Sequence, residues 1–99
     1  DRNLGLIFQL IDMRHPPTAD DMQMINFLIE SEIPFVIIFT KADKLSKRQR
    51  EERMAGFAQE IPYFSDIEHV EFSAENGEGA DKIRNIICEL AESGNDDIG

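Results

Sequence analysis

Hydrophobic and polar residues are distributed along the chain in a pattern that predicts three strands and three helices in alternation. Residues 4–11 and 34–39 are almost continuously apolar, which is typical of strands buried on both faces of a parallel sheet. Residues 69–72 alternate polar with apolar positions and predict a shorter strand. Between these strands and after the last one, apolar residues recur three or four positions apart, which predicts helices over about 19–31, 46–61 and 80–94.

The ends of the predicted helices carry recognisable signals. Thr18 with Asp21, and Ser46 with Gln49, have the spacing of a capping box, in which side chains bond the first free N–H groups of a helix. Gly94 is expected to end the last helix. Residues 95–99 are then predicted to form a frayed tail beyond a single domain over residues 1–94.

The order of the elements predicts an α/β fold, in which helices cover both faces of a parallel three-stranded sheet. So small a sheet leaves a hydrophobic strand at its edge, which proteins normally cover. The first strand also begins almost at Asp1, without an initiator methionine. We therefore interpret the chain as part of a larger fold whose preceding half is missing.

Charge is distributed unevenly along the 99 residues. The net charge of −10 disfavours nucleic acid as a general partner. Six of the ten basic residues nevertheless fall in one short segment: Lys41, Lys44, Lys47, Arg48, Arg50 and Arg53. They form either a solvated helix face partnered by Glu51 and Glu52, or a local patch for an anionic partner such as ribosomal RNA.

Three further classes of feature narrow the picture. The single cysteine, Cys88, cannot form an internal disulfide, in agreement with a reducing cytoplasm. No apolar run is long enough to span a membrane, so a membrane is not expected as a partner. Two histidines and one cysteine at these spacings form no recognisable metal site.

The densest candidate chemistry follows the second and third predicted strands. Thr40-Lys41-Ala42-Asp43 comes directly after one strand, and Ser73-Ala74 comes directly after Phe72 at the end of the other. Ligands of open α/β folds bind at the carboxyl ends of the strands, so these loops can converge on one ligand. The sequence thus predicts a binding site formed by two neighbouring loops.

The residue types in these loops suit a guanine base. The carboxylate of Asp43 can accept hydrogen bonds from both N1–H and N2–H2 of guanine, a pair of donors that adenine lacks. The aliphatic part of Lys41 can lie over the base. Thr40 can bond neighbouring loops, and the backbone N–H groups of Ser73 and Ala74 can reach the guanine O6. Lys-x-Asp is also common by chance, and Asp43 can equally cap the turn before the next helix.

Over residues 10–90 the chain resembles the EngB family of bacterial ribosome-assembly GTPases. The resemblance rests on Asp12-x-Arg-His-Pro-Pro, on Thr40-Lys41-Ala42-Asp43, and on Phe72-Ser73-Ala74. It implies the carboxyl-terminal half of a Ras-like P-loop GTPase fold, with the last two motifs binding the guanine base of GTP or GDP. It further implies a bacterial cytoplasmic protein that uses Mg²⁺ and acts in assembly of the large ribosomal subunit and in cell division and septation.

Other parts of the GTPase pattern are not found in this sequence. There is no G-x-x-x-x-G-K-[ST] phosphate loop, no Asp-x-x-Gly motif, and no assignable switch threonine. Phosphoryl transfer depends on such groups and on Mg²⁺. We therefore expect neither catalytic residues nor metal ligands in this chain, and we expect that it does not hydrolyse GTP alone.

Two other interpretations compete with a GTPase fragment. The first is a non-enzymatic half-domain that dimerises, or binds a partner, through its exposed first strand. The second is a receiver-like signalling domain with Asp12 as phosphoacceptor, which is disfavoured because no acidic pair precedes Asp12.

Overall fold

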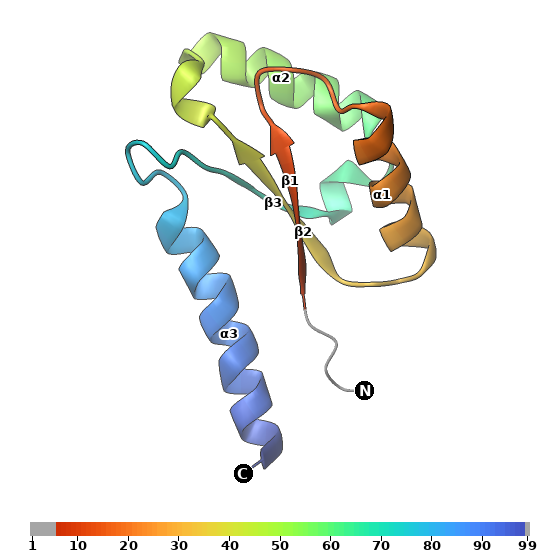
Figure 1. Ribbon diagram of the computed structural model, residues 1–99, viewed down its shortest axis with the longest axis vertical. Helices are drawn as coiled ribbons and strands as arrows, with labels where there is room; N and C mark the ends of the chain where they lie inside the picture. Colours follow the sequence, from red (N-terminus) through yellow and green to blue (C-terminus); the bar gives the residue numbers. More distant parts are fainter. Residues whose placement is uncertain (1–5, 99) are drawn as a thin grey trace.

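The computed structural model describes the backbone of residues 6–98 and the side chains of residues 6–89. The predicted order of strand and helix is confirmed, and the connections contain two short 3₁₀ turns (Figure 1). The elements are β1 (Ile7–Asp12), α1 (Ala19–Glu30), β2 (Phe35–Thr40), a 3₁₀ turn (Ala42–Lys44), α2 (Lys47–Glu60), a second 3₁₀ turn (Phe64–Asp66), β3 (Glu68–Glu71) and α3 (Ala80–Ile98).

The three strands form one parallel sheet with the order β1-β2-β3. β2 lies at the centre, and its continuous run of apolar residues is explained by burial on both faces. Ile38 of β2 is the register partner of Val70 in β3. This register brings the carboxyl ends of β2 and β3, and the loops that follow them, to the same edge of the sheet.

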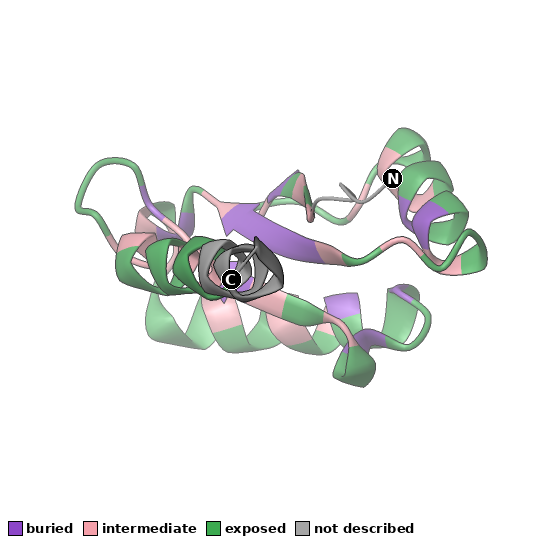
Figure 2. Ribbon diagram, turned by 90° about the horizontal axis from the view of Figure 1, so that it is seen from below, coloured by how far each residue is buried: buried purple, intermediate pink, exposed green. Residues whose placement is uncertain are grey.

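Alternate side chains of β2 enter two hydrophobic clusters. On one face Ile37 and Phe39 pack with residues of α1 and α2, and the ring of Phe39 stacks on Phe57 with centroids 4.5 Å apart. On the other face Val36 and Ile38 pack with Val70 and with two isoleucines of α3. Figure 2 shows the buried length of the central strand between the helices. The predicted three-layer α/β fold is therefore confirmed.

The prediction that both faces of the first strand are covered is wrong. Leu10 is 60% exposed, although it shares a face with Phe8, which packs in the cluster under α3. β1 is an edge strand, and in the described part of the chain its backbone pairs with β2 alone. The apolar side chains of β1 are therefore only partly buried by the described residues.

The helix starts were predicted more accurately than their faces and ends. Both capping boxes are present, at Thr18 and at Ser46. Two apolar residues of α1, Met24 and Phe27, are 44% and 56% exposed, so they lie outside the buried face of this helix. The expected stop at Gly94 is also wrong, because α3 continues to Ile98. A single glycine costs a helix only about 1 kcal/mol and does not by itself end one.

In the connection after α2, Phe64 is buried and Tyr63 is exposed. The boundary between a domain over residues 1–94 and a frayed tail stays a prediction. Within the described residues, no helix combines the length and the apolar character needed to cross a membrane.

Candidate guanine-base site

The loops after β2 and β3 are joined through their main chains. The N–H of Ala42 donates to the carbonyl oxygen of Phe72 at 3.1 Å, and the N–H of Phe72 donates to the carbonyl oxygen of Phe39 at 2.8 Å. The sheet therefore continues, as backbone hydrogen bonds, into the region where the sequence predicts a ligand. These hydrogen bonds fix the position of the two loops relative to one another without a bound ligand.

A cavity of about 290 Å³ lies between these loops. Such a volume is at the lower end of small-molecule sites, which begin at about 300 Å³, and suits one flat base better than a whole nucleotide. It is lined by Thr40, Lys41, Asp43, Lys44, Phe72, Ala74 and Glu75. Two of the predicted site residues, Ala42 and Ser73, are instead fully buried beneath it.

The carboxylate of Asp43 lies at the centre of the polar contacts. Its Oδ1 accepts a hydrogen bond from Ser73 Oγ at 2.7 Å, and Lys44 Nζ lies 3.6 Å from its Oδ2. The hydrogen bond from Ser73, aided by the charge of Lys44, holds the pKa of Asp43 below its ordinary value. Ser46, not Asp43, provides the capping side chain of α2. Asp43 is therefore an ionised acceptor at the cavity.

Ser73 acts mainly within the protein. Its hydroxyl also accepts hydrogen bonds from the N–H groups of Glu75 and Asn76, at 3.2 and 3.3 Å. Its own N–H donates to the carbonyl oxygen of Glu78 at 3.0 Å. Of the two N–H groups predicted for the guanine O6, only that of Ala74 has no partner among residues 6–89.

The loop after β2 contains a strained residue. Lys41 has φ of 66° and ψ of 28°, in the left-handed region that non-glycine residues seldom occupy. Such a conformation costs on the order of 1–3 kcal/mol and persists where surrounding contacts hold it. Thr40 supplies one such contact, since its Oγ1 donates to the carbonyl oxygen of Ile11 at 3.4 Å.

Arg50 and Glu78 also belong to this region, although the sequence predicted neither of them as a site residue. Arg50 Nε donates to the carbonyl oxygen of Ala42 at 3.0 Å, and its two terminal nitrogens donate to the Glu78 carboxylate at 2.6 and 2.8 Å. These hydrogen bonds hold the pKa of Glu78 below its ordinary value. The residues are far apart in sequence, and no spacing rule connects them.

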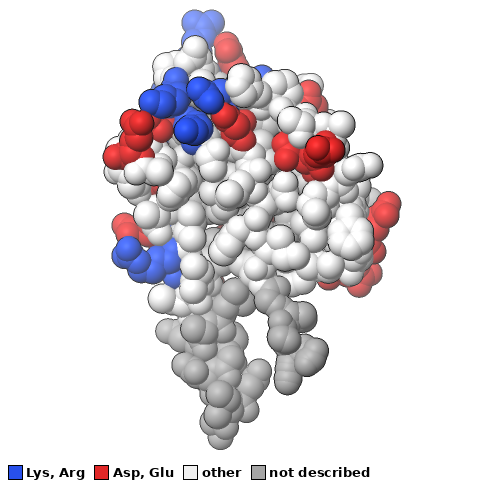
Figure 3. Space-filling model, viewed as in Figure 1, with Lys and Arg blue, Asp and Glu red and all other residues white. Residues whose placement is uncertain are grey.

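The basic segment is interleaved with acidic side chains. Arg48 lies 3.6 Å from Glu52, and Lys44 Nζ lies 3.4 Å from Glu75, in addition to the Arg50 pair. Figure 3 shows Lys and Arg side chains gathered next to acidic ones at this end of the molecule. The arrangement agrees with a solvated, charge-paired helix face.

Asp12 has its own partner at the end of β1. Its carboxylate accepts hydrogen bonds from Arg14, from the backbone N–H at 2.9 Å and from Nε and Nη2 at 3.1 and 2.9 Å. The Arg14 hydrogen bonds lower the pKa of Asp12 to about 2. Asp12 is thus an ionised group that fixes the loop before α1.

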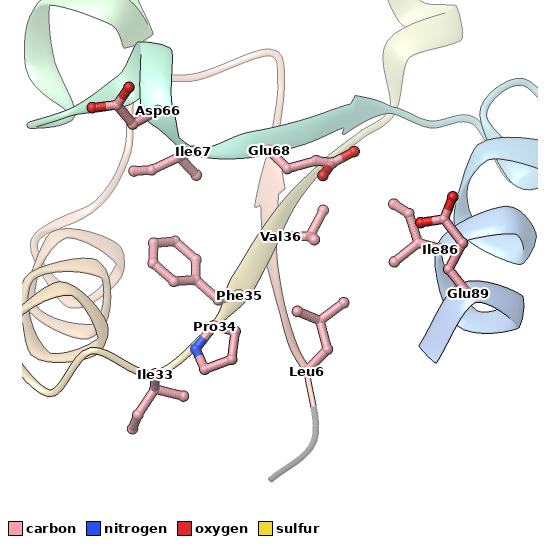
Figure 4. Close-up of a pocket in the computed structure, with 10 residues that line it drawn as sticks. All are labelled: Leu6, Ile33, Pro34, Phe35, Val36, Asp66, Ile67, Glu68, Ile86 and Glu89. Carbon is pink, nitrogen blue, oxygen red and sulfur yellow. The ribbon is translucent and has the colours of Figure 1, made fainter. Parts of the chain in front are cut away.

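A second cavity, of about 520 Å³, lies at the opposite ends of the strands. Figure 4 shows the side chain of Val36 in β2 facing Ile86 of α3 across it. Its rim carries the carboxylates of Asp66, Glu68 and Glu89, and none of its ten lining residues is basic. These charges would repel phosphate groups. The smaller cavity beside Asp43 is therefore the better nucleotide site.

The described residues do not provide a metal centre. They contain no group of three or more His, Cys, Asp or Glu side chains that could hold an ion. The magnesium ion implied by the resemblance therefore does not fit onto these residues.

The fold is shared with solved structures of translation elongation factor SelB from Methanococcus maripaludis. The apo form matches 86% of this chain and 19% of that chain with a TM-score of 0.70 and 20% identity. The complex with the GTP analogue GppNHp matches 91% of this chain and 20% of that chain with a TM-score of 0.68 and 22% identity. These matches show that the chain shares the parallel α/β fold of one part of that elongation factor.

Curated sequences identify the family. Proteins described as probable GTP-binding protein EngB are 40% identical over 86% of this chain in an Exiguobacterium species and 45% identical over 74% in Geobacillus kaustophilus. The chain covers 43% and 37% of these relatives, less than half their length. No protein-family model matches the chain. The resemblance is confirmed: the chain belongs to the EngB family as part of such a protein.

Proposed function

We propose that this chain recognises the guanine base of GTP and GDP as part of an EngB-type GTP-binding protein. The observation that carries the proposal is the ionised carboxylate of Asp43 beside a base-sized cavity, between loops joined by main-chain hydrogen bonds. The side chain of Asp43 is only 15% exposed, so leaving it without a ligand donor in a closed complex would be costly.

The carboxylate can serve both Ser73 and the base. Each carboxylate oxygen has two lone pairs, so Oδ1 can keep the Ser73 hydrogen bond while accepting one from guanine. Guanine presents N1–H and N2–H2 side by side, whereas adenine presents an acceptor at N1. A site built around such a pairing rejects the wrong base by orders of magnitude.

The wider role of the protein is proposed from the resemblance. We propose that the whole protein hydrolyses GTP with Mg²⁺ in the bacterial cytoplasm, assists assembly of the large ribosomal subunit, and affects cell division and septation. The described residues line a candidate base site and contain no metal cluster. We therefore propose that this chain by itself does not hydrolyse GTP.

The proposal is tested by nuclear magnetic resonance titration of the ¹⁵N-labelled chain with GMP, IMP and AMP. GMP is expected to shift the signals of residues 40–43 and 72–75. IMP, which lacks the N2 amino group, is expected to bind about tenfold more weakly, because one charge-assisted hydrogen bond is lost. Equal affinity for GMP and AMP, or shifts confined to the cavity of Figure 4, would contradict the proposal.

A second candidate function rests on the exposed face of β1. Leu10 is 60% exposed on a strand whose backbone pairs only with β2 in the described part of the chain. If the outer edge of β1 paired with a second copy of the chain or with a partner, its backbone N–H and C=O groups would be hydrogen-bonded and Leu10 would become less exposed. Sedimentation equilibrium measures the self-association, and a mass of one chain at every concentration would exclude the dimer.

A further inference from the structure

The side chain of Arg50 contacts both loops of the candidate base site. Its Nε donates to the carbonyl oxygen of Ala42, directly before Asp43. Its terminal nitrogens form a two-bonded pair with Glu78, in the loop that follows Ser73. A third acceptor, Glu71 Oε1 in β3, lies 3.4 Å from Nη1. One guanidinium thus joins the ends of β2 and β3.

The anchor of this guanidinium is itself well held. Arg50 lies in the first turns of α2, where its backbone N–H donates to the carbonyl oxygen of Ser46 at 2.9 Å. Its side chain is 22% exposed, so its ion pair is screened less than one on the open surface. The planar fork of arginine holds two acceptors at a fixed separation, which a lysine cannot do.

A continuous series of contacts leads from Arg50 to the carboxylate that faces the ligand. Glu78, held by Arg50, accepts the N–H of Ser73 at its carbonyl oxygen, 3.0 Å away. Ser73 in turn donates its hydroxyl to Asp43 at 2.7 Å. Arg50 is not among the residues that line the cavity. Arg50 therefore contacts Asp43 only indirectly, through Ala42 in one loop and through Glu78 and Ser73 in the other.

We propose that Arg50 is a positioning residue, which holds the loops of residues 40–43 and 72–79 at the separation that base recognition requires. Its effect on guanine rests on the proposed function, whereas the joining of the loops does not. The two parts can therefore be tested separately on the same protein.

The joining of the loops is tested by backbone hydrogen exchange in Arg50→Gln. The N–H groups of Ala42 and Ser73 are expected to exchange at least about tenfold faster, because charge-assisted hydrogen bonds that hold both loops are lost. Amides in the middle of β2 should keep their protection, which shows that the variant is folded. Arg48→Gln is the matched control, since Arg48 pairs with Glu52 on the same helix.

Unchanged exchange at Ala42 and Ser73 in Arg50→Gln would overturn the proposal. If Arg50→Gln does not fold, Arg50→Lys replaces it, because it keeps the charge but cannot make the forked pair. Exchange at these two amides in Arg50→Lys as slow as in the native chain would equally overturn it.

The effect on guanine is tested by GMP titration of the same variants. Arg50→Gln is expected to weaken GMP binding by about tenfold, and adding Glu78→Gln should weaken it little further, because both changes break one contact series. Faster exchange with native GMP affinity would overturn the link to the base. A native chain that binds GMP and AMP equally would contradict the proposed function, and hydrogen exchange would still decide the role of Arg50.

Discussion

Asp43→Asn is expected to make the base site prefer xanthine to guanine nucleotides. Xanthine has an oxygen where guanine has the N2 amino group, so it accepts a hydrogen bond from the asparagine amide. The asparagine carbonyl still accepts from N1–H. The ratio of the dissociation constants for GMP and XMP should change by about a hundredfold or more, as for sites that pair polar groups with the ligand. Titration of both proteins with both nucleotides measures this ratio.

Asp12→Asn is the matched control for this exchange. It makes the same chemical change in a carboxylate that bonds Arg14 and does not line the cavity. Its base preference should equal that of the native chain. The hydroxyl of Ser73 can donate to the new amide oxygen in Asp43→Asn, so the loop contact is preserved. Native GMP affinity in Asp43→Asn would remove Asp43 from the site.

Gly79→Ala is expected to give the largest loss of stability among the alanine substitutions of Gly56, Gly77 and Gly79. A Cβ atom at Gly79 would collide with the carbonyl oxygen of Glu71 and lie 3.0 Å from Cγ1 of Val70. The residue also has φ of +84°, which an alanine adopts only with strain. Together these effects should lower the free energy of unfolding by about 3 kcal/mol. Urea denaturation measures the loss.

Alanine substitutions at two other glycines distinguish the cost of backbone strain from the cost of a steric clash. Gly77 has φ of +79° but open space around its Cβ position, so Gly77→Ala should cost only about 1–2 kcal/mol. Gly56 lies inside α2 with nothing within 4 Å, and Gly56→Ala should stabilise the protein by about 1 kcal/mol. A loss in Gly79→Ala no greater than in Gly77→Ala would contradict the close approach to Glu71.

The order of elements was predictable because local patterns determine it. Capping boxes mark where α1 and α2 begin, and the unbroken apolar run of β2 agrees with its place between two clusters. β1 has the same apolar composition, yet Leu10 is exposed. An apolar strand indicates that cover is required, and its sequence does not indicate which neighbour supplies the cover.

The candidate site likewise has a part that the sequence predicts and a part that depends on tertiary packing. The loop with Asp43 follows β2 and Phe72 follows β3, so the parallel sheet alone brings these two segments together. The pairing of Arg50 with Glu78 depends on how α2 lies against the loop after β3, and that is a tertiary relation. The hydrogen bond from the Ser73 N–H to the carbonyl oxygen of Glu78 could not be predicted from the sequence for the same reason.

The central position of β2 makes the base loop a dependent part of the whole domain. Alternate residues of this strand belong to the clusters on both sides of the sheet, and the strand ends at Thr40, where the loop that carries Asp43 begins. The loop therefore depends on this strand as well as on the contacts of Arg50. Weakening either hydrophobic layer loosens the same strand, so the ability to distinguish bases should disappear together with the cooperative fold, without a separate earlier transition.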